Sequence, residues 1–113
     1  MKRLTAAAAL AALMLAVSTT AMACDQDDAL TKWEQAEEHE IILGAGNING
    51  TMSFAVDEGV WDQLDFGTRL GMVETFQCLV AGPGNVLRTA NVINRGGRVL
   101  AVWDGISKQL DIK

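Results

Sequence analysis

Two cysteines are the side chains of this sequence best suited to covalent chemistry. Cys24 and Cys78 are about 54 residues apart, and neither belongs to the Cys-x-x-Cys motif of a redox catalyst. In an oxidising compartment they would join in a disulfide, which loop-closure entropy makes worth roughly 4 kcal/mol. The sequence therefore predicts a structural disulfide between Cys24 and Cys78.

Cys24 also fits a second chemistry, lipidation. Residues 20–23 resemble the lipobox of a bacterial lipoprotein in placing small residues before Cys24, but Ala21 stands where that motif usually has Leu. Lipidation of Cys24 would leave Cys78 as an odd thiol in an exported protein. We favour the disulfide and keep a lipid anchor at Cys24 as the alternative.

Residues 1–23 have the layout of a secretory signal peptide. The stretch begins with two basic residues, continues with an apolar run over residues 4–17, and ends in an Ala-x-Ala cleavage site. About 14 apolar residues are fewer than the roughly 20 that cross a bilayer as a helix. We therefore expect cleavage after Ala23, export to a bacterial periplasm, and one mature domain over residues 24–113.

The expected mature chain is strongly acidic. Without the two basic residues of the leader it holds seven Lys and Arg against fourteen Asp and Glu, a net charge of −7 with His39 neutral. Residues 25–40 contain seven of the acids and one base. An acidic surface disfavours nucleic acid and anionic lipid, so we expect no nucleic-acid partner, and a membrane only if Cys24 is lipidated. The acidic segment is either a solvated helix face or a patch for a basic partner or a loosely held cation.

His39 is the one histidine, and it lies among three glutamates in the run Glu37-Glu38-His39-Glu40. A zinc or catalytic site of the H-E-x-x-H type would need a second His, and adjacent helical residues do not share a face. We therefore expect that the protein is not an enzyme, and that it has no catalytic residue, no metal site and no cofactor. The alternative is a metal-handling or enzyme accessory protein that uses the acidic helix and His39.

Three tryptophans are the largest apolar side chains of the sequence. Trp33, Trp61 and Trp103 are interpreted as anchors of the core or of its edge. One of them could instead lie exposed in a partner-binding patch, since aromatic side chains often anchor such patches. The candidate partner surface is Trp33 together with Glu37 and Glu38.

The pattern of apolar residues predicts an α+β domain. An acidic helix and loop are expected over residues 24–46, where Gly44-Ala45-Gly46 breaks the helical pattern, and a β-α-β-β core over residues 47–113. The expected order is α-β-α-β-β, with helices on one face of an antiparallel-rich sheet. The individual expectations are a helix over 28–39, a strand over 47–56, a helical turn at 60–64, a longer helix capped by Asp65 and stopped at 82–84, strands over 86–94 and 98–103 joined by a turn at 95–97, and a short last strand within 106–113.

The spacing of Val60-Trp61 and Leu64, then a helix, then a hairpin ending in residues 100–103, resembles a group of small exported bacterial α+β proteins of uncharacterised function. The resemblance covers about the last 65 residues and implies the fold and the export. Together these observations predict an exported periplasmic module that binds a protein or a cell-envelope component without catalysis.

Overall fold

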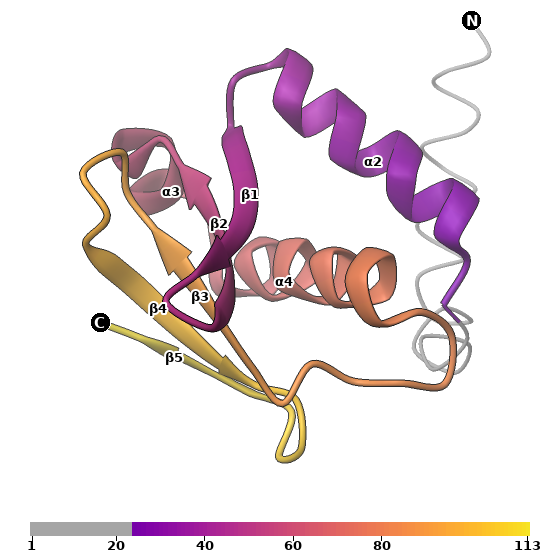
Figure 1. Ribbon diagram of the computed structural model, residues 1–113. Coiled ribbons are helices and arrows are strands. Elements are labelled where there is room, and N and C mark those ends of the chain that lie inside the picture. Colours follow the sequence, from indigo (N-terminus) through magenta and orange to yellow (C-terminus); the bar gives the residue numbers. More distant parts are fainter. Residues whose placement is uncertain (1–23) are drawn as a thin grey trace, which may run out of the picture.

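A computed structural model describes residues 24–113, so the expected signal peptide lies outside the described residues. These residues form a single layer of sheet with helices against it (Figure 1). The elements are α2 (Gln26–Glu38), β1 (Ile42–Ile48), β2 (Thr51–Val56), α3 (Glu58–Gln63), α4 (Phe66–Ala81), β3 (Thr89–Ile93), β4 (Val99–Asp104) and β5 (Gln109–Ile112).

The five strands lie in the order β1-β2-β3-β4-β5, which is also their order in the chain. Three of the four neighbouring pairs are antiparallel, whereas β2 and β3 run parallel. A parallel pair needs a crossover connection, and here α3 and α4 supply it. The predicted α+β class is confirmed, but the sheet is mixed.

The first hairpin differs from the sequence prediction. The strand expected over residues 47–56 is two strands, β1 and β2, joined at Asn49-Gly50, and the loop expected at residues 44–46 lies within β1. Asn49 has φ 52° and Gly50 has φ 86°, so both turn residues adopt the left-handed backbone of a type I′ turn. The turn places Ile48 on the first strand, where it is 46% exposed instead of sharing a buried face with Phe54.

One face of the sheet carries the core. Phe54 pairs in register with Val92, and Val92 pairs with Ala101, so the three side chains point to the same side. Helices α2 and α4 lie over this side (Figure 1). The core consists of Trp33, Ile42, Phe54, Val56, Trp61, Val73, Phe76, Ala90, Val92, Leu100, Ala101, Trp103 and Leu110.

The longer helix begins as the sequence predicts. Asp65 caps α4 by accepting a hydrogen bond of 2.7 Å from the backbone N–H of Thr68, and the helix ends at Gly82, which has φ 86°. The hydrogen bonds from Thr68, backbone first, hold the pKa of the Asp65 carboxyl below its ordinary value of 3.8. A carboxylate with a lowered pKa stabilises the fold above its unfolded pKa, and that contribution is lost as the pH falls through the folded pKa.

We therefore expect Asp65→Asn to lower the melting temperature at neutral pH but to converge on the wild type in acid. Asn keeps an acceptor for the cap and cannot titrate, so the wild-type advantage should disappear as the pH falls below 3.8 and through the lowered pKa of Asp65. Melting curves of both proteins from neutral pH into acid measure this. A constant difference across that range would contradict the role of the Asp65 charge.

Candidate partner-binding surface

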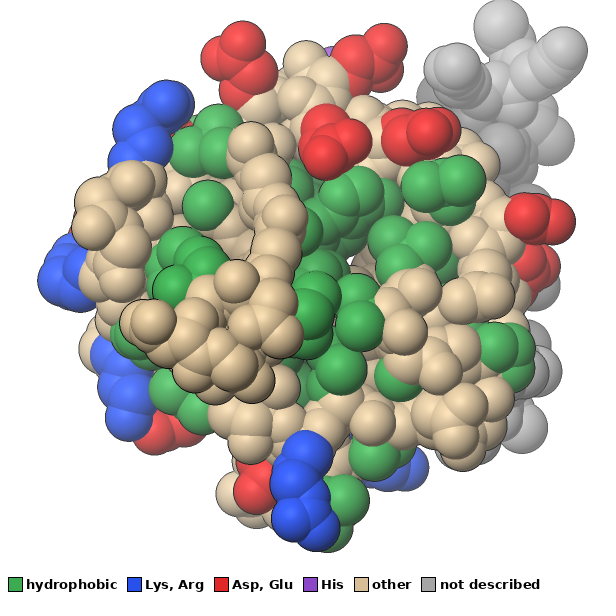
Figure 2. Space-filling view, in the orientation of Figure 1, with side chains coloured by type: hydrophobic (Ala, Val, Ile, Leu, Met, Phe, Trp, Pro, Cys, Tyr) green, Lys and Arg blue, Asp and Glu red, His purple; other side chains and the backbone are tan. Residues whose placement is uncertain are grey.

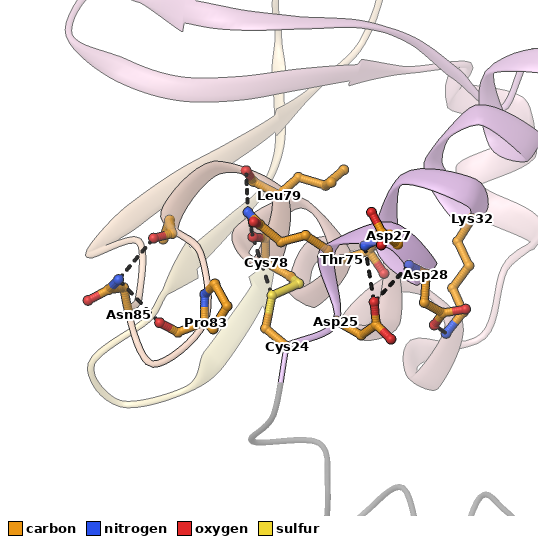
Figure 3. The surroundings of a disulfide bond; sticks show 12 residues. Cys24, Asp25, Asp27, Asp28, Lys32, Thr75, Cys78, Leu79, Pro83 and Asn85 are labelled. Carbon is orange, nitrogen blue, oxygen red and sulfur yellow. Dashed lines mark hydrogen bonds and ion pairs between the residues drawn. A yellow bond between two sulfur atoms is a disulfide. The ribbon is translucent and has the colours of Figure 1, made fainter.

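Cys24 and Cys78 form the predicted disulfide, with Cα atoms 5.5 Å apart. The bond ties Cys24, two residues before the start of α2, to Cys78 in the last turn of α4 (Figure 3). The sulfur of Cys24 cannot be in this bond and carry a lipid at the same time. The disulfide therefore links the chain just before α2 to the C-terminal part of α4.

Two further contacts hold the start of α2 against α4. The side-chain amide of Gln26 donates to the carbonyl of Cys78 at 3.0 Å and to that of Leu79 at 3.3 Å. Asp25 caps α2 by accepting hydrogen bonds of 3.1 Å from the backbone N–H groups of Asp27 and Asp28. The Asp25 carboxylate thus satisfies two N–H groups of the first turn that have no partner within the helix, so this acid serves the helix itself.

The exposed side of α2 is acidic along its length. Figure 2 shows acidic side chains gathered over α2, whereas the basic side chains lie over the opposite parts of this face. Glu37 and Glu38 are exposed at the end of the helix, and Glu40 follows in the connection to β1. The backbone N–H of Ile41 donates to the carbonyl of Ala36 at 2.9 Å, which keeps this connection tight. The acidic end of α2 therefore lies at the start of β1.

Trp33 does not belong to this surface. It is 8% exposed, and its ring lies 5.3 Å from both the Phe54 and Phe76 rings, edge-on to the first and stacked on the second. The prediction that Trp33 anchors a partner together with Glu37 and Glu38 is therefore wrong. The apolar stripe of α2 is narrow, and Trp33, its largest side chain, packs the helix against the core.

The other two tryptophans are also buried, at 1% exposure each. Trp61 lies under the guanidinium of Arg69, which is 5.1 Å from the ring centre and donates through Nε to the Trp61 carbonyl at 3.0 Å. Trp103 donates through Nε1 to the side-chain oxygen of Gln77 at 3.0 Å. The interpretation of the tryptophans as core anchors is confirmed.

The outer edge of β1 carries free backbone groups. Ile48 and Thr51 flank the two-residue turn and form a hydrogen-bonded pair. From this pair on, hydrogen-bonded and non-hydrogen-bonded positions alternate along the two strands. Ala45 and Asn47 stand opposite Phe54 and Met52 at non-hydrogen-bonded positions. Their N–H and C=O groups therefore point away from β2, and no described residue pairs with them.

The two edges of the sheet differ in their protection. Natural edge strands are commonly kept from pairing by charges, proline or short length. Strand β5 is four residues long, and Asp111 on it forms an ion pair of 2.9 Å with Lys113. Strand β1 is seven residues long and has neither a charged residue nor a proline, and its one irregularity is a bulge at Leu43. The β1 edge is therefore the edge open to pairing.

A depression of about 380 Å³ lies beside the disulfide. Desolvation raises the pKa of the Glu74 carboxyl on its wall, and the charge of Lys108 opposes this shift. Gln77 also lines it, but the side-chain oxygen of Gln77 already accepts from the Leu87 N–H at 2.9 Å and from Trp103. The side chain of Gln77 therefore serves the fold, and the depression is less suited to bind a partner than the β1 edge.

His39 is exposed and closes α2 as its C-terminal cap, where its backbone N–H donates to the carbonyl of Gln35 at 3.1 Å. Among residues 24–113, no group of three or more His, Cys, Asp and Glu side chains is arranged to hold a metal ion. Within the same residues, every helix is too short or too polar to cross a membrane.

Comparison of this chain with known protein families, with curated proteins and with solved structures finds no match in any of the three. The candidate partner-binding surface is therefore described from the positions of its own residues. The structure places Glu37 and Glu38 beside the start of β1, joins Cys24 to Cys78, and buries Trp33. Sequence reasoning missed the β1 edge, although the Asn-Gly dipeptide that closes its hairpin is a strong signal for such a turn.

Proposed function

We propose that the mature chain is an exported periplasmic module that binds another protein without catalysis. One observation carries the proposal: the sheet ends in an uncharged seven-residue strand, β1, whose outward N–H and C=O groups have no partner among the described residues. Such an edge is a ready template for a strand of another chain. A protein partner therefore fits the surface better than a small molecule or an anionic lipid.

Two features support the compartment. The leader pattern of residues 1–23 is typical of export, and the Cys24–Cys78 disulfide suits an oxidising periplasm. The disulfide and the Gln26 contacts also hold α2 firmly on α4. A binding module gains affinity from such rigidity, because less conformational freedom is lost on association.

The proposal predicts that Ala45→Pro abolishes partner capture while the domain stays folded. Proline removes the outward N–H of Ala45, and no described hydrogen bond depends on that group. Ala45→Val is the matched control, since it keeps the N–H and favours a strand. The measurement is cross-linked capture from periplasmic extract with each variant, together with its circular dichroism spectrum. Capture of the same protein by wild type and Ala45→Pro alike would show that the edge is not the binding surface.

A further inference from the structure

The structure also points to the chemistry of the partner, an inference that rests on the function proposed above. We propose that β1 accepts an extended segment of another protein as a sixth, antiparallel strand, and that this segment carries Lys or Arg at its C-terminal end. The antiparallel direction is slightly the more stable of the two. It places the C-terminal end of the segment beside the start of β1, where Glu37, Glu38 and Glu40 lie.

The backbone of β1 provides the affinity. Ala45 and Asn47 each offer one N–H and one C=O on the outer edge, spaced two residues apart as a neighbouring strand requires. Asn47 keeps its side chain occupied, because its Oδ1 accepts from the Gly50 N–H at 2.9 Å. The turn therefore stays closed, and the edge is already in the geometry that a new strand would pair with.

An apolar hollow beside β1 could select the side chains of an added strand. Ala45 and Asn47 share the sheet face that carries the core, yet both are exposed, so the helices do not close over this part of β1. Figure 2 shows hydrophobic side chains gathered in a hollow between β1 and the helices, with acidic side chains along the α2 side. Every second side chain of an added strand would point toward this hollow. These side chains are therefore expected to be apolar.

Charge determines which strand fits. Residues 25–40 hold seven acids and one base, so they account for six of the seven net negative charges of residues 24–113. Part of this charge, on Glu37, Glu38 and Glu40, lies at the end of α2 and in its connection to β1, beside one end of the edge. A basic segment would be attracted, and a second copy of this chain with its own net charge of −7 would be repelled. Charge complementarity therefore selects a basic partner over self-association.

The test is selection from a displayed library of random peptides about ten residues long, enough to span β1. The immobilised bait is the oxidised protein over residues 24–113. We expect enriched peptides to alternate apolar residues and to carry Lys or Arg toward the C-terminal end. The best peptide is then synthesised, and its affinity is measured for wild type and variants at low and high salt.

Four variants separate the contributions to binding. Ala45→Pro should weaken the peptide about tenfold or more, and Ala45→Val by less than about twofold, because only proline removes the edge N–H. Glu37→Gln with Glu38→Gln should weaken it about three- to tenfold and flatten the salt dependence. Asp27→Asn with Asp28→Asn makes the same charge change at the far end of α2 and should have less than about a twofold effect.

Three results would overturn the inference: enriched peptides without a basic bias, equal peptide affinity for wild type and Ala45→Pro, or a wild-type dimer that Ala45→Pro converts to a monomer. Failure of the proposed function looks different, because wild type would then capture no periplasmic protein at all. If capture depends on Ala45 while the peptides show no preference for Lys or Arg, the function stands and the basic partner is wrong.

Discussion

Replacing Phe76 with Ala should lower the free energy of unfolding by about 3–5 kcal/mol. Phe76 is 2% exposed on α4, and its ring lies 4.9 Å from Phe54 on β2 and 5.3 Å from Trp33 on α2. The truncation would open a cavity where two helices and the sheet meet, so neighbours from three elements would lose contacts together. Urea titration of the oxidised protein measures the change.

Val80→Ala is the matched control on the same helix. Val80 is 41% exposed, so its truncation should change the stability by less than about 0.5 kcal/mol. If Phe76→Ala unfolded at the same urea concentration as Val80→Ala, the contacts among Trp33, Phe54 and Phe76 would not be the centre of the core.

Removing the disulfide, by replacing both Cys24 and Cys78 with Ser, should cost roughly 4 kcal/mol. The bond closes a loop with a sequence separation of 54, so its loss returns much conformational freedom to the unfolded chain. The total stability of a small domain is only about 5–15 kcal/mol, and the double variant should therefore be marginally folded. Melting curves of wild type, reduced wild type and the double variant measure the effect.

The mass of the exported protein checks the bond itself. We expect the mass of a chain cleaved after Ala23, lower by two hydrogens than the dithiol form. Reduced wild type should melt close to the double Ser variant, since both lack the cross-link. A diacylglycerol adduct on Cys24 would contradict the disulfide and establish the lipoprotein alternative.

The fold class and most elements could be predicted from local signals. Asp65, as a cap before an apolar periodic run, correctly predicts the start of α4, and Gly82 correctly predicts its end. The turn at residues 95–97 is confirmed, because the Asn94 N–H donates to the Arg98 carbonyl at 2.9 Å. These signals depend on neighbouring residues alone, so they can be read without knowledge of the tertiary structure.

The β1 edge could not be predicted in the same way. Gly44 and Gly46 favour a loop when judged by propensity, yet pairing with Ala55 and Ser53 holds them in a strand. The burial of Trp33 depends likewise on Phe54 and Phe76, which are distant in sequence. Both features of the candidate site come from tertiary contacts, and no local pattern encodes which strand will be left without a neighbour.

The parallel pairing of β2 with β3 also separates the local strand contacts of the sheet from its most distant one. The hairpin β1–β2 closes through two residues, and β3, β4 and β5 follow one another through short turns, so each group depends on contacts that are near in sequence. Pairing of β2 with β3 must instead close the whole stretch between Val56 and Thr89, the longest connection between neighbouring strands of the sheet. We therefore expect the β2–β3 pairing to form later than the β1–β2 hairpin. Until it forms, both edges of that hairpin would be open to a chaperone or a neighbouring chain.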